Sequence, residues 1–236
     1  MRDTNGKGIG KDMSIGKQYQ SIRQQISGHV RIVLAGKTRT QQEIEEVIEA
    51  GATDIGENYV QEAENMRPAL GKKADAVTWH MIGDLQKNKI NKALRIFDVI
   101  QTVDSLEKAA AINKRAQTAN KIMPVYLEIN IGSEITKSGF TPEYATVEQA
   151  VRKMAEFDHI ALTGLMTMGP RSGDPEKSRL YFRKTKEIFE RIQKLDLPNV
   201  RMKTLSMGMS NTYMVAIEEG ANMVRLGTAV FGTRAA

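Results

Sequence analysis

Short apolar segments alternate along this chain with longer amphipathic ones. The apolar segments are rich in β-branched residues and predict eight strands, at Arg31–Gly36, Thr53–Gly56, Val77–Ile82, Asp98–Thr102, Val125–Ile131, Ala161–Met166, Met202–Ser206 and Met223–Leu226. Between them, apolar residues recur at helical spacing and predict helices that include 40–50, 142–156 and 175–194. Strands that alternate with helices are typical of parallel βαβ units.

Eight such units predict a single α/β domain, a (β/α)8 TIM barrel. The alternative is an open, doubly wound sheet, which often carries a G-x-G-x-x-G loop after its first strand. The first turn here, 36–39, lacks that motif and favours the barrel.

One further helix is expected before the first strand. Apolar residues recur there at helical spacing, at Ile15, Tyr19, Ile22 and Ile26. Ser14 suits an N-cap and Gly28 a stop. Residues 1–13 are polar and show no periodicity, so we expect a disordered extension at 1–13 and one barrel domain at 14–236.

The composition narrows the class of protein. A chain of 236 residues with 26% charged and 41% hydrophobic residues is ordinary for a globular domain. It has no cysteine, which fits a reducing compartment, and we expect a cytoplasmic protein. Neither a secretory signal nor an apolar run of the ~18 residues that span a bilayer is evident, so we expect no association with a membrane. No group of histidine and acidic residues has the spacing of metal ligands, so we expect no metal site.

The net charge of +6 raises the question of nucleic acid. However, the basic residues are dispersed among acids, and the one conspicuous basic stretch, 87–95, has no interleaved aromatic residues. We interpret that stretch as a solvated helix face and expect no nucleic acid; an RNA-binding barrel is the alternative. The charge would equally favour a small anionic ligand.

Lys37 is the most informative residue, because it follows the first buried strand. The active sites of barrel enzymes lie where the strands end. A lysine there can condense with an aldehyde when its amine is neutral. Strict alternation places Val33, Ala35 and Lys37 on one face of the strand. The alternative interpretation is an ordinary solvated lysine.

The last two strand ends predict an anion site. Loops after strands 7 and 8 often hold phosphate in barrels. Ser206 and Thr228 offer hydroxyl groups, and Gly208 and Gly227 let backbone N–H groups approach an anion. Arg225 should point inward, because Val224 and Leu226 alternate with it. A buried ion pair with Glu57 is the alternative role of Arg225.

Two residues at other strand ends are ambiguous. Asn58 follows the second strand and could line a site or cap the next helix. His80 lies beside Trp79 within the third strand, where a lone histidine is more often structural than catalytic.

Seven motifs in order resemble the YggS/PROSC family of pyridoxal 5'-phosphate (PLP) homeostasis proteins, related to the N-terminal barrel of alanine racemase. They are Lys37-Thr38, GENYVQE at 56–62, WHMIGDLQKNK at 79–89, TKSG at 136–139, GLMTM at 164–168, LSMGMS at 205–210 and VRLGTAVFG at 224–232. The family usually has serine before the lysine and Lys-Pro two residues after it, where this chain has Gly36, Arg39 and Thr40.

The resemblance implies a cofactor and its ligands. Lys37 would form a Schiff base with PLP. The phosphate would be held by Ser206, Gly227 and Thr228, with backbone help from the turn of Met207 and Gly208. Three further residues would lie near the ring: Arg225 at the ring nitrogen, and Asn58 and His80 along the pocket.

We expect a carrier with little or no turnover. An arginine at the ring nitrogen weakens the ring as an electron sink, because two cations repel. Racemisation needs acid and base on both faces of the substrate. In alanine racemases the second base is a tyrosine from a separate domain, whereas this chain ends soon after its last strand, at Ala236. We expect a monomer that delivers PLP to apo-enzymes; a PLP-dependent amino-acid racemase is the alternative.

Overall fold

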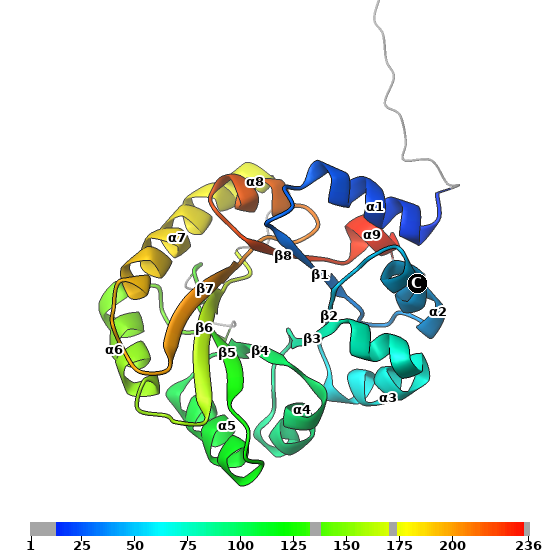
Figure 1. Cartoon of the computed structure of the whole chain (residues 1–236). Coiled ribbons are helices and arrows are strands. Elements are labelled where there is room, and N and C mark those ends of the chain that lie inside the picture. Colours follow the sequence, from blue (N-terminus) through cyan, green and yellow to red (C-terminus); the bar gives the residue numbers. More distant parts are fainter. Residues whose placement is uncertain (1–12, 133–137, 170–173, 234–236) are drawn as a thin grey trace, which may run out of the picture.

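Eight parallel strands close into a barrel in the order β1 to β8, with β8 pairing back onto β1 (Figure 1). The computed structural model describes residues 13–132, 138–169 and 174–233. The strands are β1 (Arg31–Ala35), β2 (Asp54–Glu57), β3 (Thr78–Met81), β4 (Val99–Val103), β5 (Met123–Glu128), β6 (Ile160–Met166), β7 (Val200–Ser206) and β8 (Met223–Leu226). The predicted fold is therefore confirmed.

A ring of helices surrounds the barrel (Figure 1). The α-helices of the described residues are α1 (Ile15–Gln25), α2 (Gln41–Glu49), α3 (Val60–Leu70), α4 (Ile90–Ile96), α5 (Leu106–Thr118), α6 (Tyr144–Met154), α7 (Arg179–Gln193), α8 (Tyr213–Glu218) and α9 (Thr228–Phe231). Short 3-10 turns occur at η1 (Gly71–Ala76), η2 (Lys87–Lys89) and η3 (Pro175–Ser178).

The boundaries differ from the predicted ones by a few residues. The segment predicted as one helix from Pro175 is a 3-10 turn followed by α7, and β5 ends at Glu128 rather than Ile131. Beyond β5, Ile129 forms an isolated bridge with Phe140. The expected extension at 1–13 lies, apart from Met13, outside the described residues.

The extra N-terminal helix is present. The Ser14 hydroxyl caps α1 by accepting from Lys17 N, and the Arg23 guanidinium donates to the carbonyl oxygens of Ile26, Ser27 and Val30 just after the helix. These bonds satisfy carbonyls beyond the helix end, which lies before the predicted Gly28.

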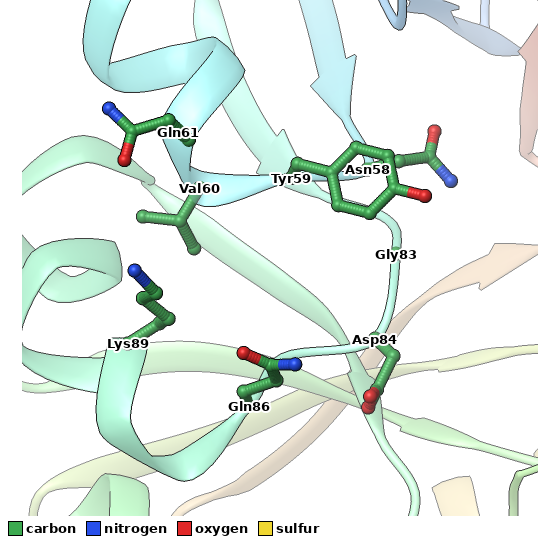
Figure 2. A pocket seen from close by; sticks show the side chains of 8 residues that line it. All are labelled: Asn58, Tyr59, Val60, Gln61, Gly83, Asp84, Gln86 and Lys89. Atoms are coloured by element: carbon green, nitrogen blue, oxygen red, sulfur yellow. The ribbon is translucent and has the colours of Figure 1, made fainter.

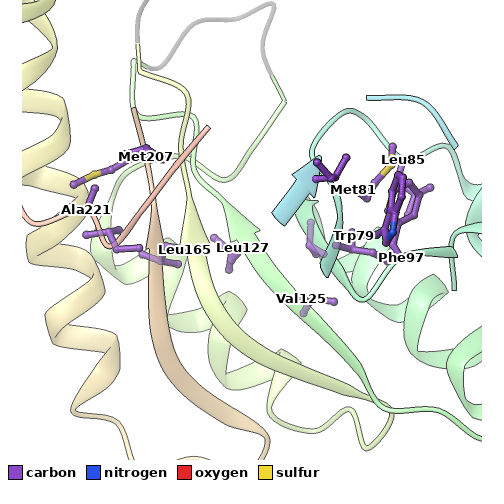
Figure 3. Packing of buried hydrophobic residues seen from close by; sticks show 14 of the residues in the cluster. Trp79, Met81, Leu85, Phe97, Val125, Leu127, Leu165, Met207 and Ala221 are labelled. Atoms are coloured by element: carbon purple, nitrogen blue, oxygen red, sulfur yellow. The ribbon is translucent and has the colours of Figure 1, made fainter. Parts of the chain in front are cut away.

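The two faces of each strand pack against different cores. Residues such as Ile32, Leu34 and Val224 face the helices and join the large cluster between strands and helices, part of which Figure 3 shows. Val33 and Ala35 belong to a second, smaller cluster inside the barrel. The alternation predicted for the first strand is thus confirmed, and it aims the inner face of β1 toward Lys37.

Candidate functional site

Lys37 lies in the turn after β1, separated from the last strand residue, Ala35, by Gly36. Its side chain is half-buried, and Nζ lies 3.5 Å from the Tyr59 hydroxyl and 4.9 Å from the centre of that ring. Thr38 adopts a φ of 63°, a conformation that costs energy for a branched residue and is frequent at functional sites. The turn therefore presents the amine at the carboxyl end of the barrel.

The turn is held from both sides. Thr40 forms a capping box with Glu43 at the start of α2. Arg39 donates to the carbonyl oxygens of Phe231 (3.4 Å) and Gly232 (3.0 Å) at the end of α9. These contacts fix the turn that carries Lys37 between α2 and α9.

The end of β8 lies beside the end of β1. Leu34 pairs with Leu226, and a Cβ on Gly227 would lie 3.6 Å from that of Ala35. Backbone N–H groups of Gly227 and Ala229 both donate to the Ser210 hydroxyl, each at 3.1 Å. Converging N–H groups of this kind suit an anion. Gly227 thus lies beside Ala35, two residues before Lys37 in the sequence.

Thr228 directly follows Gly227 at the end of β8, whereas the Ser206 side chain is buried. Thr228 is exposed, and among the described residues its hydroxyl has no hydrogen-bond partner. The Ser206 hydroxyl is fully buried, donates to Gln101 Oε1 and accepts from Arg225. The phosphate role expected of Ser206 is thus at odds with its position; Ser210, four residues later, has the accessible hydroxyl.

The turn after β7 is also occupied by structural contacts. Met207 N–H donates to Met223 O, and the Met207 side chain is buried in the outer core. Gly208 adopts a φ of +92° and its carbonyl accepts from Arg225 N. The backbone N–H of Met207 therefore cannot serve an anion as expected.

Arg225 points into the barrel, as its alternation predicts. Nη1 donates to Ser206 O (3.1 Å) and Oγ (2.7 Å), and Nη2 donates to Thr167 O (2.8 Å). Burial lowers the pKa of Arg225 to about 10, and the charge of Glu128 opposes this shift. The guanidinium thus stays cationic at neutral pH.

Glu57 is not the partner of Arg225. It lies on the outer face of β2, next to Gly36, and burial followed by the charge and hydrogen bonding of Glu62 raises the pKa of Glu57 to about 8. The alternative of a Glu57–Arg225 ion pair is wrong, because one side chain faces the helices and the other faces the barrel axis.

His80 lies below the expected ring site. Its side chain is 0% exposed inside the barrel, with Nε2 2.8 Å from Asp54 Oδ1 and Nδ1 3.0 Å from Gln101 Nε2. It therefore belongs to the layer under the rim rather than to the pocket lining.

Asn58 does lie at the rim. The N-cap of α3 is Tyr59, without a side-chain cap bond, so the capping alternative for Asn58 is wrong. Asn58 and Tyr59 point to the same side in Figure 2, at one edge of a cavity of about 290 Å³. The cavity is lined by Asn58, Tyr59, Val60, Gln61, Gly83, Asp84, Gln86 and Lys89.

Glu128 is a rim residue that the motifs do not single out. It ends β5 on the same face as Tyr126, so alternation is the signal that indicates it. Burial, followed by the charge of Asp104, raises the pKa of Glu128 to about 7.

Two of the four basic residues in the stretch 87–95 form ion pairs within the described residues. Lys87 bonds to Glu107, and Lys92 lies 2.9 Å from Glu64. These surface pairs fit the interpretation of a solvated face better than that of an RNA site. In the described part of the chain, no helix is long and apolar enough to cross a membrane.

Comparisons with known proteins place the chain in one family. Residues 13–235 match the family model described as alanine racemase, N-terminal domain. Proteins named pyridoxal phosphate homeostasis protein are similar: that of Aquifex aeolicus is 39% identical over 86% of this chain and 87% of its own, and that of Escherichia coli K12 is 32% identical over 87% and 86%.

Solved structures agree. PipY of Synechococcus elongatus, solved with PLP bound, is 29% identical with a TM-score of 0.83 and covers 92% of this chain and 100% of its own. Alanine racemase of Clostridium difficile shares the fold at 15% identity and a TM-score of 0.78, over 94% of this chain and 56% of its own. The predicted resemblance is confirmed: the chain belongs to the alanine racemase N-terminal domain family and, within it, to the pyridoxal phosphate homeostasis proteins.

Proposed function

We propose that this protein binds PLP, with Lys37 as the covalent anchor for its aldehyde. The observation that carries the proposal is the convergence of a half-buried amine after β1 with an anion cradle after β8. The PLP-bound PipY structure supports it, since that protein covers nearly the same stretch of chain. The donors present also suit a phosphorylated aldehyde.

The phosphate would be held by Ser210, Thr228 and the backbone N–H groups of Gly227 and Ala229. The Ser210 hydroxyl already marks where both N–H groups converge. A phosphate oxygen can accept from these groups and from the Thr228 hydroxyl. The expected contributions of Ser206, Met207 and Gly208 then become indirect, through the shape of the β7 end.

The ring would lie between Lys37 and Arg225, with Asn58 at the rim. Bound PLP supplies an electrophilic aldehyde and a ring that withdraws electrons best when its nitrogen is protonated. The Arg225 cation disfavours a second cation beside it. This arrangement favours retention of the cofactor over turnover.

We therefore propose a monomeric carrier that gives PLP to apo-enzymes. Tyr59 is the hydroxyl that contacts Lys37 Nζ, and it is 54% exposed. An exposed tyrosine on the side of the lysine does not supply an acid on the opposite face of a substrate. Sedimentation of the loaded protein, and transfer to a PLP-requiring apo-enzyme, test the oligomeric state and the recipient.

Borohydride trapping tests the anchor. Wild type incubated with PLP should show a visible absorbance band, and reduction followed by peptide mapping should place the adduct on Lys37. Lys37→Arg keeps the charge without the nucleophile and should lose the band, whereas exposed Lys17→Arg should keep it. Absence of bound PLP in the wild type would contradict the proposal.

Isotope exchange separates the carrier from a racemase. The loaded protein is incubated with amino acids in deuterated water, and exchange at the α-carbon is followed by NMR. We expect exchange no faster than with free PLP. Sustained exchange that requires Lys37 would establish the racemase instead.

A further inference from the structure

A run of hydrogen-bonded side chains crosses the interior of the barrel below Arg225. It passes through Ser206 on β7, Gln101 on β4 and His80 on β3 to Asp54 on β2. Each of these side chains belongs to a residue at most 5% exposed. We call four of them the inner network: Ser206, Gln101, His80 and Asp54.

The direction of each hydrogen bond follows from Arg225, because a guanidinium can only donate. Ser206 Oγ accepts from Nη1 at 2.7 Å, so its own proton goes to Gln101 Oε1 at 2.8 Å. Gln101 Nε2 then donates to His80 Nδ1 at 3.0 Å. His80 consequently carries its proton on Nε2 and donates it to Asp54 Oδ1 at 2.8 Å.

Asp54 ends the network as a carboxylate. It also accepts from the Thr53 hydroxyl at 2.8 Å and pairs with Arg31 at the opposite end of the barrel. Burial would raise the pKa of Asp54, but the hydrogen bond and charge of His80, and then Arg31, bring it below its usual value.

Only a neutral His80 fits this arrangement. Burial lowers the pKa of His80 against the opposing effect of Asp54, and the other charged groups that act on the ring are Arg31 and Asp98. A proton on His80 Nδ1 would point at the N–H of the Gln101 amide, and two donors would then face each other. If the amide turned over, the Ser206 proton would lose its acceptor. Every donor therefore points from Arg225 toward Asp54.

Arg225 needs such support because its direct partners are neutral. Its three hydrogen bonds reach Ser206 O, Ser206 Oγ and Thr167 O. They leave part of the five-donor guanidinium for a ligand acceptor. Aligned hydrogen bonds polarise one another, and here they lead to a carboxylate.

We propose that the inner network consists of positioning residues that hold the Arg225 guanidinium against the ring nitrogen of PLP. This inference rests on the proposed function. It assigns His80 and Gln101 a role without contact to the cofactor, and it explains why polar side chains replace apolar ones in the middle of the barrel.

PLP titration of the full chain tests the effect on the cofactor. Gln101→Leu and Ser206→Ala interrupt the network and should each weaken PLP binding about tenfold, the equivalent of one good hydrogen bond. Both should also shift the visible band, which reports the ring environment. Gln101→Glu keeps an acceptor for Ser206 and should bind within about threefold of wild type. Ser178→Ala, another buried serine, is the control and should change neither quantity.

Two outcomes of the PLP titration would contradict the proposal. If Gln101→Leu and Ser206→Ala fold as judged by circular dichroism, yet bind PLP with wild-type affinity and band, the positioning role is wrong. If Ser178→Ala weakens binding as much as they do, the effect is general destabilisation and the proposal also fails.

NMR of histidine nitrogens in the PLP-free protein tests the geometry independently. Wild-type His80 should be neutral, protonated on Nε2 and unchanged from pH 6 to 9. In Gln101→Glu, Nδ1 faces a carboxylate, so His80 should become doubly protonated near pH 6. The opposite tautomer in wild type, or an unaffected His80 in the variant, overturns the network. If wild type binds no PLP while these NMR results hold, the proposed function fails and the geometry stands.

Discussion

At the scale of single residues, the least satisfied group near the site is Glu57. The residue is 1% exposed. Among the described residues, neither oxygen of its carboxylate accepts a hydrogen bond, and an ionised Glu62 cannot donate one. The adjacent position 36 is glycine in this chain, where the family usually has serine. A Cβ at Gly36 would overlap with Glu57 Oε1, so a side chain at this position requires the carboxylate to shift. The glycine thus removes the hydroxyl that could satisfy the buried acid.

Gly36→Ser should therefore be more stable than Gly36→Ala at alkaline pH, because both variants displace the Glu57 carboxylate but only serine adds a donor. A hydroxyl donor favours the ionised carboxylate and lowers the pKa of Glu57. We expect the unfolding free energy of Gly36→Ser to exceed that of Gly36→Ala by about 1 kcal/mol at pH 9 and to differ little from it at pH 6, measured by urea unfolding. Gly36→Ala adds the carbon without the donor and is the matched control. Equal behaviour of the two variants would contradict the role of the hydroxyl.

At the scale of elements, the loops around the site depend on contacts between the turn after β1 and the end of α9. Arg39 links the turn after β1 to the end of α9, and its guanidinium lies 5.0 Å from the Phe231 ring. A lysine cannot reproduce this planar, two-carbonyl contact. The lysine anchor and the anion cradle therefore share one support.

Arg39→Lys should loosen both halves of the site. We expect a loss of about 1 kcal/mol in unfolding free energy, with PLP binding several times weaker. Arg152→Lys, in an exposed i,i+4 pair on α6, is the control and should be nearly neutral. An unchanged PLP affinity in Arg39→Lys would show that the two loops are supported separately.

A second element-scale test concerns β6 and β7. A Cβ on Gly164 would lie 2.5 Å from Thr204 O, a backbone atom that cannot move without disturbing the strand pairing. Gly164→Ala should cost about 2 kcal/mol in thermal or urea unfolding. Gly28→Ala meets no atom within 4 Å and should be neutral. Comparable stabilities of the two variants would show that the strands tolerate the contact.

At the scale of the whole molecule, buried acids make stability depend on pH. The pKa of Glu57 is raised from 4.5 to about 8, and that of Glu128 from 4.5 to about 7. The folded protein thus binds protons that the unfolded chain releases. Their contribution is fully present below pH 4.5 and is lost as pH rises through about 7 and 8.

Glu57→Gln isolates the larger of these effects. It should raise the unfolding free energy at pH 8.5 by on the order of 2 kcal/mol relative to wild type and flatten the slope between pH 5 and 8. Urea unfolding across this range measures both. Parallel curves for variant and wild type would show that Glu57 is not the group that titrates.

The order of strands and helices, the place of Lys37 after the first strand and the inward direction of Arg225 could be predicted from the sequence, because they depend on local periodicity. Alternation predicted that the Arg225 side chain lies on the opposite strand face from Val224 and Leu226. Eight strand–helix units and a first turn without a G-x-G-x-x-G motif favoured the barrel over an open doubly wound sheet. The contacts of Ser206, His80 and Glu57 could be learned only from the tertiary structure. Register across strands far apart in sequence decided that Ser206 meets Gln101 rather than an anion, that His80 meets Asp54, and that Glu57 faces away from Arg225.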